Sequence, residues 1–214
     1  MRLCIKVLTV LCVAMALMSS SVRTFPDADG GSRRLFADTL RVDSIARDTD
    51  LWTCGQLIEF SCKAPVYWDE HGRVESGMLG INTIILCADN KFREFSRGYN
   101  VSFDERGLLI SGTPSVGIEI TVQEQLVLSM PYTDVSFYPN GTVRHIVPSE
   151  SFRYSTADGF KFSVAAGHRV VFDMYGRLRR AVVARRRIMQ RADGSQKVFQ
   201  PGDEIVINEI GRVE

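Results

Sequence analysis

The chain of 214 residues lacks a charge bias. Its 26 Lys and Arg residues are balanced by 25 Asp and Glu residues, so the formal net charge is +1. This balance gives no global attraction to polyanions, and we expect no nucleic-acid partner. Beyond the N-terminus, no segment approaches the roughly eighteen apolar residues that a membrane-spanning helix needs. We therefore expect no transmembrane span in the mature chain.

The sequence also lacks the common motifs of catalysis. It has three histidines, and neither an HExxH nor a Cys-x-x-Cys pattern accompanies them. There is no Gly-x-Ser-x-Gly nucleophile elbow and no phosphate-binding glycine loop. We therefore expect a non-enzymatic protein without a cofactor or a metal site. The alternative is a secreted hydrolase or other enzyme whose site follows no familiar pattern.

The only long apolar run lies at the N-terminus. Arg2 and Lys6 precede an apolar stretch over residues 7–18, and three serines follow at 19–21. A basic start, a short apolar run and small residues are typical of a secretory signal peptide. We predict a signal peptide over residues 1–21 and a periplasmic, cell-surface or secreted location. The alternatives are an uncleaved anchor and a buried strand.

Cysteine is scarce after this segment. Cys54, Cys62 and Cys87 remain, and in an oxidising compartment one pair can form a disulfide. Cys54 and Cys87 hold similar positions in neighbouring units of the repeat described next, so we predict that these two lie within bridging distance. The alternative is that all three are small, buried apolar residues.

What the sequence does contain is a regular period. Five glycines follow one another at separations of 35, 34, 35 and 35 residues: Gly72, Gly107, Gly141, Gly176 and Gly211. An apolar residue stands six before each of them: Val66, Val101, Val135, Val170 and Ile205. Another stands four before: Trp68, Phe103, Phe137, Phe172 and Ile207. Such regularity indicates one unit used about five times.

Each unit has the pattern of a β-hairpin. The two apolar positions are two residues apart, which is the period of a strand with one buried face. An Asp commonly follows them, and Asp-x-x-Gly is typical of a tight turn. An alternative role for these aspartates is a calcium site, which would need six or more oxygens at one point.

We therefore predict an all-β fold of tandem, roughly 35-residue β-hairpin repeats, stacked as an elongated meander or solenoid. The repeat domain would span residues 51–214, after a linker and N-terminal cap over residues 22–50. Trp68, Phe103, Phe137 and Phe172 should form one buried ladder. The alternatives are a closed barrel and an ordinary β-sandwich with evenly spaced turns.

One local charge anomaly follows Gly176. Seven arginines lie within residues 177–191, and arginine binds carboxylates and phosphates through its planar fork. The candidate anion-binding residues are Arg179, Arg180, Arg185, Arg186 and Arg187. On a continuous strand, the side chains of 185 and 187 would share one face and that of 186 the other. The alternative role is a solvated strand that protects a sheet edge.

The phrase Phe-x-x-Gly-x-x-Val-x-Phe-x-x-x-Gly-x-Leu runs from Phe95 to Leu109, and related forms run over residues 60–74 and 199–213. Over about residues 45–214 the chain resembles exported bacterial β-hairpin repeat proteins of the MORN-variant and WG-repeat kind. That resemblance implies binding or scaffolding rather than catalysis. For an exported protein, the anionic partner would be an envelope glycan, a lipid or an acidic protein.

Overall fold

The computed structural model describes residues 41–53 and 55–214, and these residues form strands and turns without a helix. The all-β class predicted from the sequence is confirmed. The strands are β1 (Arg41–Asp43), β2 (Thr49–Thr53), β3 (Gln56–Phe60), β4 (Val66–Trp68), β5 (Val74–Met78), β6 (Thr83–Leu86), β7 (Phe92–Phe95), β8 (Asn100–Phe103), β9 (Leu109–Gly112), β10 (Glu119–Val122), β11 (Gln125–Leu128), β12 (Val135–Phe137), β13 (Val143–Ile146), β14 (Phe152–Ser155), β15 (Lys161–Val164), β16 (Val170–Phe172), β17 (Leu178–Val182), β18 (Arg187–Gln190), β19 (Gln196–Phe199) and β20 (Glu204–Val206).

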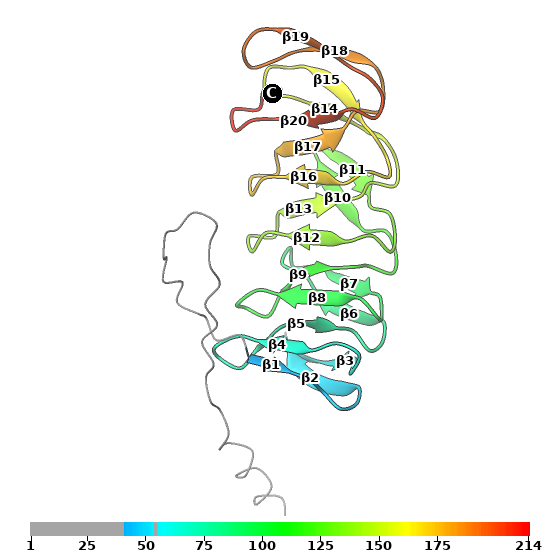
Figure 1. Cartoon of the computed structure of the whole chain (residues 1–214), viewed down its shortest axis with the longest axis vertical. Coiled ribbons are helices and arrows are strands. Elements are labelled where there is room, and N and C mark those ends of the chain that lie inside the picture. Colours follow the sequence, from blue (N-terminus) through cyan, green and yellow to red (C-terminus); the bar gives the residue numbers. More distant parts are fainter. Residues whose placement is uncertain (1–40, 54) are drawn as a thin grey trace, which may run out of the picture. The chain divides into compact units, whose positions relative to one another are not determined.

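Ten of these strands form one antiparallel sheet, which we call the main sheet. Its order is β1-β4-β5-β8-β9-β12-β13-β16-β17-β20, so the strands follow one another as they do in the sequence (Figure 1). The other ten strands form five separate hairpins, β2–β3, β6–β7, β10–β11, β14–β15 and β18–β19. The chain therefore alternates between a pair of main-sheet strands and an outlying hairpin.

The glycines of the period close the main-sheet turns. All five have a positive φ between +74° and +85°, a conformation that glycine adopts without a steric penalty. The preceding acidic residue caps the turn. Asp173 Oδ1 accepts hydrogen bonds from the N–H groups of Tyr175 and Arg177, both at 2.9 Å. The equivalent pair of bonds is made at Asp69, Asp104 and Asn208.

The core lies between the main sheet and the hairpins. The apolar residues six before each turn glycine are all buried, as are Phe103, Phe137 and Phe172. The hairpins contribute buried side chains from the opposite layer, among them Phe60, Phe95 and Phe199. Gly112 lies beneath one of these rings: an added Cβ would sit 2.8 Å from Phe95 Cδ1.

The predicted aromatic ladder is wrong at one position. Trp68 is only half-buried, because its strand β4 has beyond it only the three-residue strand β1. The guanidinium of Arg41 on that strand lies 5.9 Å from the centre of the indole ring. Trp68 thus lies next to a short edge strand, whereas Phe103, Phe137 and Phe172 lie on strands in the interior of the main sheet.

Several sequence predictions fall outside the described residues. The predicted signal peptide, most of the predicted linker and cap, and Cys54 with its predicted proximity to Cys87 are among them. Within residues 41–53 and 55–214, no helix is long and apolar enough to cross a membrane. Strand β1, from the end of the predicted cap, pairs with β4 and forms one edge of the main sheet.

Candidate functional site

A row of side chains crosses the main sheet on the face opposite the hairpins. The strand register aligns one residue from each strand: Val42, Tyr67, Ser76, Ser102, Ser111, Ser136, His145, Val171, Arg180 and Val206. Directly paired residues on neighbouring strands project to the same face. This outer face therefore has small hydroxyl side chains at its centre, beside a histidine.

The most tightly bonded polar group on this face surrounds His145. Its Nδ1 lies 2.7 Å from Ser136 Oγ, and its Nε2 lies 2.7 Å from Asp134 Oδ2. Arg169 Nη2 donates to the same carboxylate oxygen at 3.3 Å, and Ser111 Oγ donates to the other oxygen at 3.4 Å. The imidazole is 14% exposed and the carboxylate 43%. Strands β9, β12 and β13, with the residues just before β12 and β16, thus bring together a connected network, which we call the His145 network.

The charges of this network favour an ionised Asp134. Burial raises the pKa of its carboxyl, but other contacts outweigh burial and lower the pKa below its usual value. These contacts are the hydrogen bond and charge of His145, the charge of Arg169 and the hydrogen bond from Ser111. An ionised carboxylate accepts the Nε2–H of His145. With a neutral ring, Nδ1 then accepts the hydroxyl proton of Ser136.

This connectivity of serine, histidine and aspartate matches that of a hydrolytic triad, with the two ring nitrogens exchanged. The nucleophile of such a triad also needs nearby hydrogen-bond donors for an oxyanion. Strand β12, which carries Ser136, pairs with β9 on one side and β13 on the other. Its backbone N–H groups are therefore held in the sheet, and an oxyanion would have to be bound by side chains.

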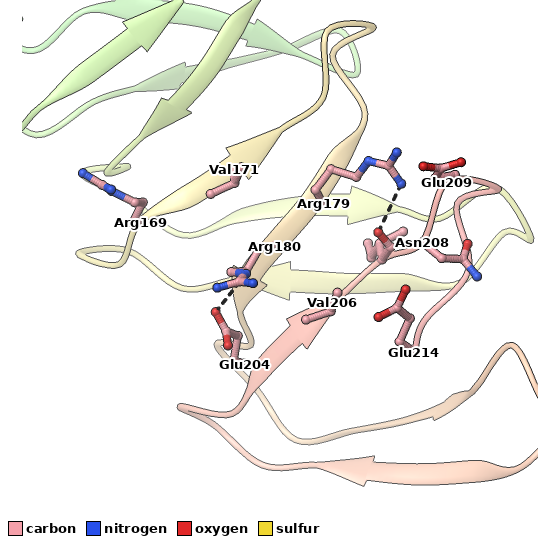
Figure 2. A pocket seen from close by; sticks show the side chains of 10 residues that line it. Arg169, Val171, Arg179, Arg180, Glu204, Val206, Asn208, Glu209 and Glu214 are labelled. Carbon is pink, nitrogen blue, oxygen red and sulfur yellow. Dashed lines mark hydrogen bonds and ion pairs between the residues drawn. The ribbon is translucent and has the colours of Figure 1, made fainter. Parts of the chain in front are cut away.

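An open groove of about 840 Å³ lies beside this network, near the end of the main sheet formed by β16, β17 and β20. Its lining is polar and charged around a few apolar side chains (Figure 2). The charged residues are Arg169, Arg179, Arg180, Glu204, Glu209 and Glu214. Arg169 belongs to both the groove and the His145 network, so the two features are continuous.

The arginines of the groove already have partners. Arg180 Nε lies 3.5 Å from Glu204 Oε1, and Arg179 Nε lies 3.4 Å from Asp173 Oδ2. Arg179 Nη1 also donates to the carbonyl of Ile207 at 3.4 Å (Figure 2). With three arginines and three glutamates, the lining carries no net charge. An anion that binds to Arg179 and Arg180 would have to compete with these ion pairs and with the hydrogen bond to Ile207.

The other three candidate arginines are placed differently. Arg185, Arg186 and Arg187 are exposed, at the connection between β17 and β18. No ion pair or side-chain hydrogen bond joins them to another described residue. The prediction that their side chains alternate along one strand is wrong, because β18 begins only at Arg187 and the chain bends at residues 184–185. We call these three residues the arginine cluster.

The surroundings of the arginine cluster add to its positive charge. Residues 183–199 contain one acid, Asp193, and five bases. The bases are Arg185, Arg186, Arg187, Arg191 and Lys197. Asp193 is itself engaged, since its Oδ1 accepts from the N–H of Ser195 at 2.9 Å. The five candidate arginines thus divide into a pair in the groove that has acidic partners and an exposed cluster that has none.

The turn aspartates do not converge. Each accepts hydrogen bonds from its own turn, and the described residues contain no group of three or more His, Cys, Asp or Glu side chains arranged to hold a metal ion. The turn-capping interpretation therefore accounts for the contacts of Asp69, Asp104 and Asp173.

The sequence did contain a signal for the His145 network that was missed. Ser136 lies between two core residues, Val135 and Phe137, so it must point away from the core. His145 lies on the strand that returns from the Gly141 turn, directly opposite Ser136. No catalytic motif marks this pair, and its two residues face each other only through the pairing of β12 with β13.

No family model matches this chain, and no curated protein is similar to it in sequence. The resemblance to MORN-variant and WG-repeat proteins therefore stays a prediction.

Proposed function

We propose that this is an exported, non-enzymatic β-repeat protein that binds an anionic partner at the cell envelope. In this proposal the 35-residue units stack in tandem as an elongated meander or solenoid. The order of the main-sheet strands and the equivalent hairpin turns support stacking. Repeat proteins of this kind use their extended surfaces for binding.

The observation that carries the proposal is the arginine cluster. Its three guanidinium groups are exposed and lack acidic partners, whereas Arg179 and Arg180 are engaged. Grouped guanidinium groups can bond to phosphate, sulfate or carboxylate oxygens through paired N–H groups. Arg185 and Arg186 lie on the connection before β18 and Arg187 is the first residue of that strand, so all three lie outside the main sheet.

The test replaces Arg185, Arg186 and Arg187 together by serine. The matched control is the triple change Arg47→Ser, Arg97→Ser and Arg212→Ser. These three arginines are exposed, lie in separate turns and make no side-chain ion pair or hydrogen bond with another described residue. Both variants therefore lose the same net charge, and only the first loses the cluster.

Binding is measured to vesicles containing anionic phospholipid, to an acidic polysaccharide and to a poly-glutamate peptide. These three probes represent the lipid, glycan and protein classes of partner. We expect binding to at least one, weakening as salt rises because exposed charges are screened over about 10 Å at 0.1 M. The cluster variant should bind more weakly than the control. Equal binding by both variants would leave edge protection as the role of the cluster.

The His145 network favours a second candidate, a secreted hydrolase acting through Ser136. The two 2.7 Å contacts of the ring with Ser136 and Asp134 are the supporting observation. A fluorophosphonate probe labels an activated serine but leaves an ordinary hydroxyl untouched. If the native protein is labelled and the Ser136→Ala and His145→Ala variants are not, the hydrolase replaces the binding protein as the better account. Absence of labelling in the native protein would remove this candidate.

A further inference from the structure

The outward faces of the first three hairpins expose large apolar side chains. Alternation along each strand turns one set of residues into the core and leaves the other set outward. The outward set includes Trp52 and Leu57 on β2–β3, Ile84 and Phe92 on β6–β7, and Leu126 and Leu128 on β10–β11. Trp52 is 68% exposed and Leu126 is 74% exposed. A row of such residues over consecutive hairpins is typical of an interaction surface.

Hydrogen bonds between neighbouring hairpins make these faces continuous. Gln56 of β3 donates through Nε2 to the carbonyl of Ile84 in the next hairpin at 2.9 Å. Ser115, just before β10, donates its N–H to the carbonyl of Glu94 on β7 at 3.1 Å. Gln125 of β11 donates to the carbonyl of Arg153 on β14 at 2.9 Å. Four hairpins thus present one connected surface.

Charge is distributed unevenly along that surface. On the first hairpin, Asp50 and Glu59 lie directly opposite each other, an arrangement of like charges that destabilises a strand pair. On the fourth hairpin, the outward positions carry Arg153 and Lys161. None of these four charged groups has an ion pair within the described chain. An acidic end and a basic end therefore occupy the same surface without contact, with two hairpins between them.

We propose that this surface binds a second copy of the chain, forming an antiparallel dimer with two-fold symmetry. The axis lies between hairpins β6–β7 and β10–β11. It sets the first hairpin of one copy against the fourth of the other, and the second against the third. The acidic pair then meets the basic pair twice, once on each side of the axis. This interface leaves the arginine cluster free and is independent of the function proposed above.

The apolar residues match in the same arrangement. Ile84 and Phe92 of one copy face Leu126 and Leu128 of the other, so the apolar centre of the interface lies on the symmetry axis. Trp52 lies beside the acidic pair, where its ring can receive a guanidinium from Arg153. A self-complementary patch of this kind, apolar at the centre and charged at the rim, is what an isologous interface needs.

A second copy fits this surface better than a lipid membrane does. Asp50, Glu59 and Glu119 project from the same faces as the apolar residues, and acidic groups oppose an anionic bilayer. A second copy supplies apolar residues opposite the exposed ones, and it supplies Arg153 and Lys161 opposite Asp50 and Glu59.

The first experiment measures the association state of the full chain by sedimentation velocity over a range of concentrations. We expect a concentration-dependent dimer. Leu126→Ser removes an apolar side chain from two symmetry-related contacts and should raise the dissociation constant by about a hundredfold or more. The control Ile210→Ser changes an aliphatic residue of similar exposure, 66% against 74%, in a turn outside the surface and should leave the dimer intact. A native chain that stays monomeric, or equal effects of both changes, overturns the proposal.

The second experiment tests the pairing of the hairpins. Reversing the acids with Asp50→Lys and Glu59→Lys should weaken the dimer, as should reversing the bases with Arg153→Glu and Lys161→Glu. Combining all four changes should restore it, because opposite charges again meet at both contacts. Three of these residues are exposed and Glu59 is half-buried at the outward face. Circular dichroism should be unchanged in every variant. Failure of the combined variant to recover dimerisation would exclude this arrangement.

Discussion

The ring of Phe103 allows the contribution of the core to be measured at one position. It lies at the end of β8, is 4% exposed, and pairs across a register shift with the fully buried Leu109. Phe103→Ala removes the ring and leaves a cavity between the main sheet and the hairpins. The expected loss in the free energy of unfolding is about 3–5 kcal/mol, the usual range for a buried aromatic residue.

In a chain of this size each kcal/mol lowers Tm by about 2–4 °C. The variant should therefore melt about 6–20 °C below the native protein, and urea unfolding followed by circular dichroism gives the free energy directly. Tyr175→Ala is the control, since that ring is 73% exposed and its main contact is with Arg177, 5.1 Å away. Its loss should cost about 1 kcal/mol or less. If Phe103→Ala were no more damaging than Tyr175→Ala, the layered core described above would be wrong.

Two local contacts and the N-terminal sequence give three further predictions. Gly112→Ala should cost about 1–3 kcal/mol in urea unfolding, because the new methyl group would overlap the ring of Phe95. Burial raises the pKa of Asp173, but hydrogen bonds from the backbone of 177 and 175 and from the guanidinium of Arg177 outweigh it and lower the pKa below its usual 3.8. The stability that this carboxylate contributes is thus present above pH 3.8 and is lost as pH falls through the folded-state pKa. Asp173→Asn keeps a capping oxygen but has no carboxyl group to protonate, so its Tm should fall less steeply than that of the native protein as the pH is lowered. An equal fall in Tm in the variant and the native protein would contradict this. Finally, the exported protein should begin after Ser21, and N-terminal sequencing that finds Met1 would favour the uncleaved anchor.

The local structure was readable from the sequence because its causes are local. Asp-x-x-Gly sets a turn through one side-chain oxygen and one positive φ, so Gly107 and Gly176 lie at hairpin turns as expected. Alternating apolar residues specified the buried face of each strand, and Phe137 and Phe172 are buried accordingly. Trp68 departs from that pattern because burial also depends on a neighbouring strand, which position in the sequence does not reveal.

The candidate site was much less readable, because it depends on contacts between strands. Arg179 and Arg185 belong to the same arginine-rich stretch of the sequence. The structure separates them, because Arg179 contacts Asp173 and the carbonyl of Ile207 while Arg185 has no such contact. A bend before β18 also ended the strand alternation expected across the three consecutive arginines. Whether an arginine is available to a ligand is decided by what the fold places within about 4 Å of it.

By itself, then, the sequence determined the β-hairpins, the turn residues and most of the buried face, since each follows from backbone preferences and side-chain alternation within a few residues. Only the tertiary structure decided that alternate strand pairs join one main sheet and that the other strands form a separate layer. That division places Asp134, Ser136 and His145 in one network and turns Trp52 and Leu126 toward solvent on a shared surface. The physical reason is that strand pairing, unlike strand formation, is set by the burial of whole faces against one another, to which residues far apart in the chain contribute together.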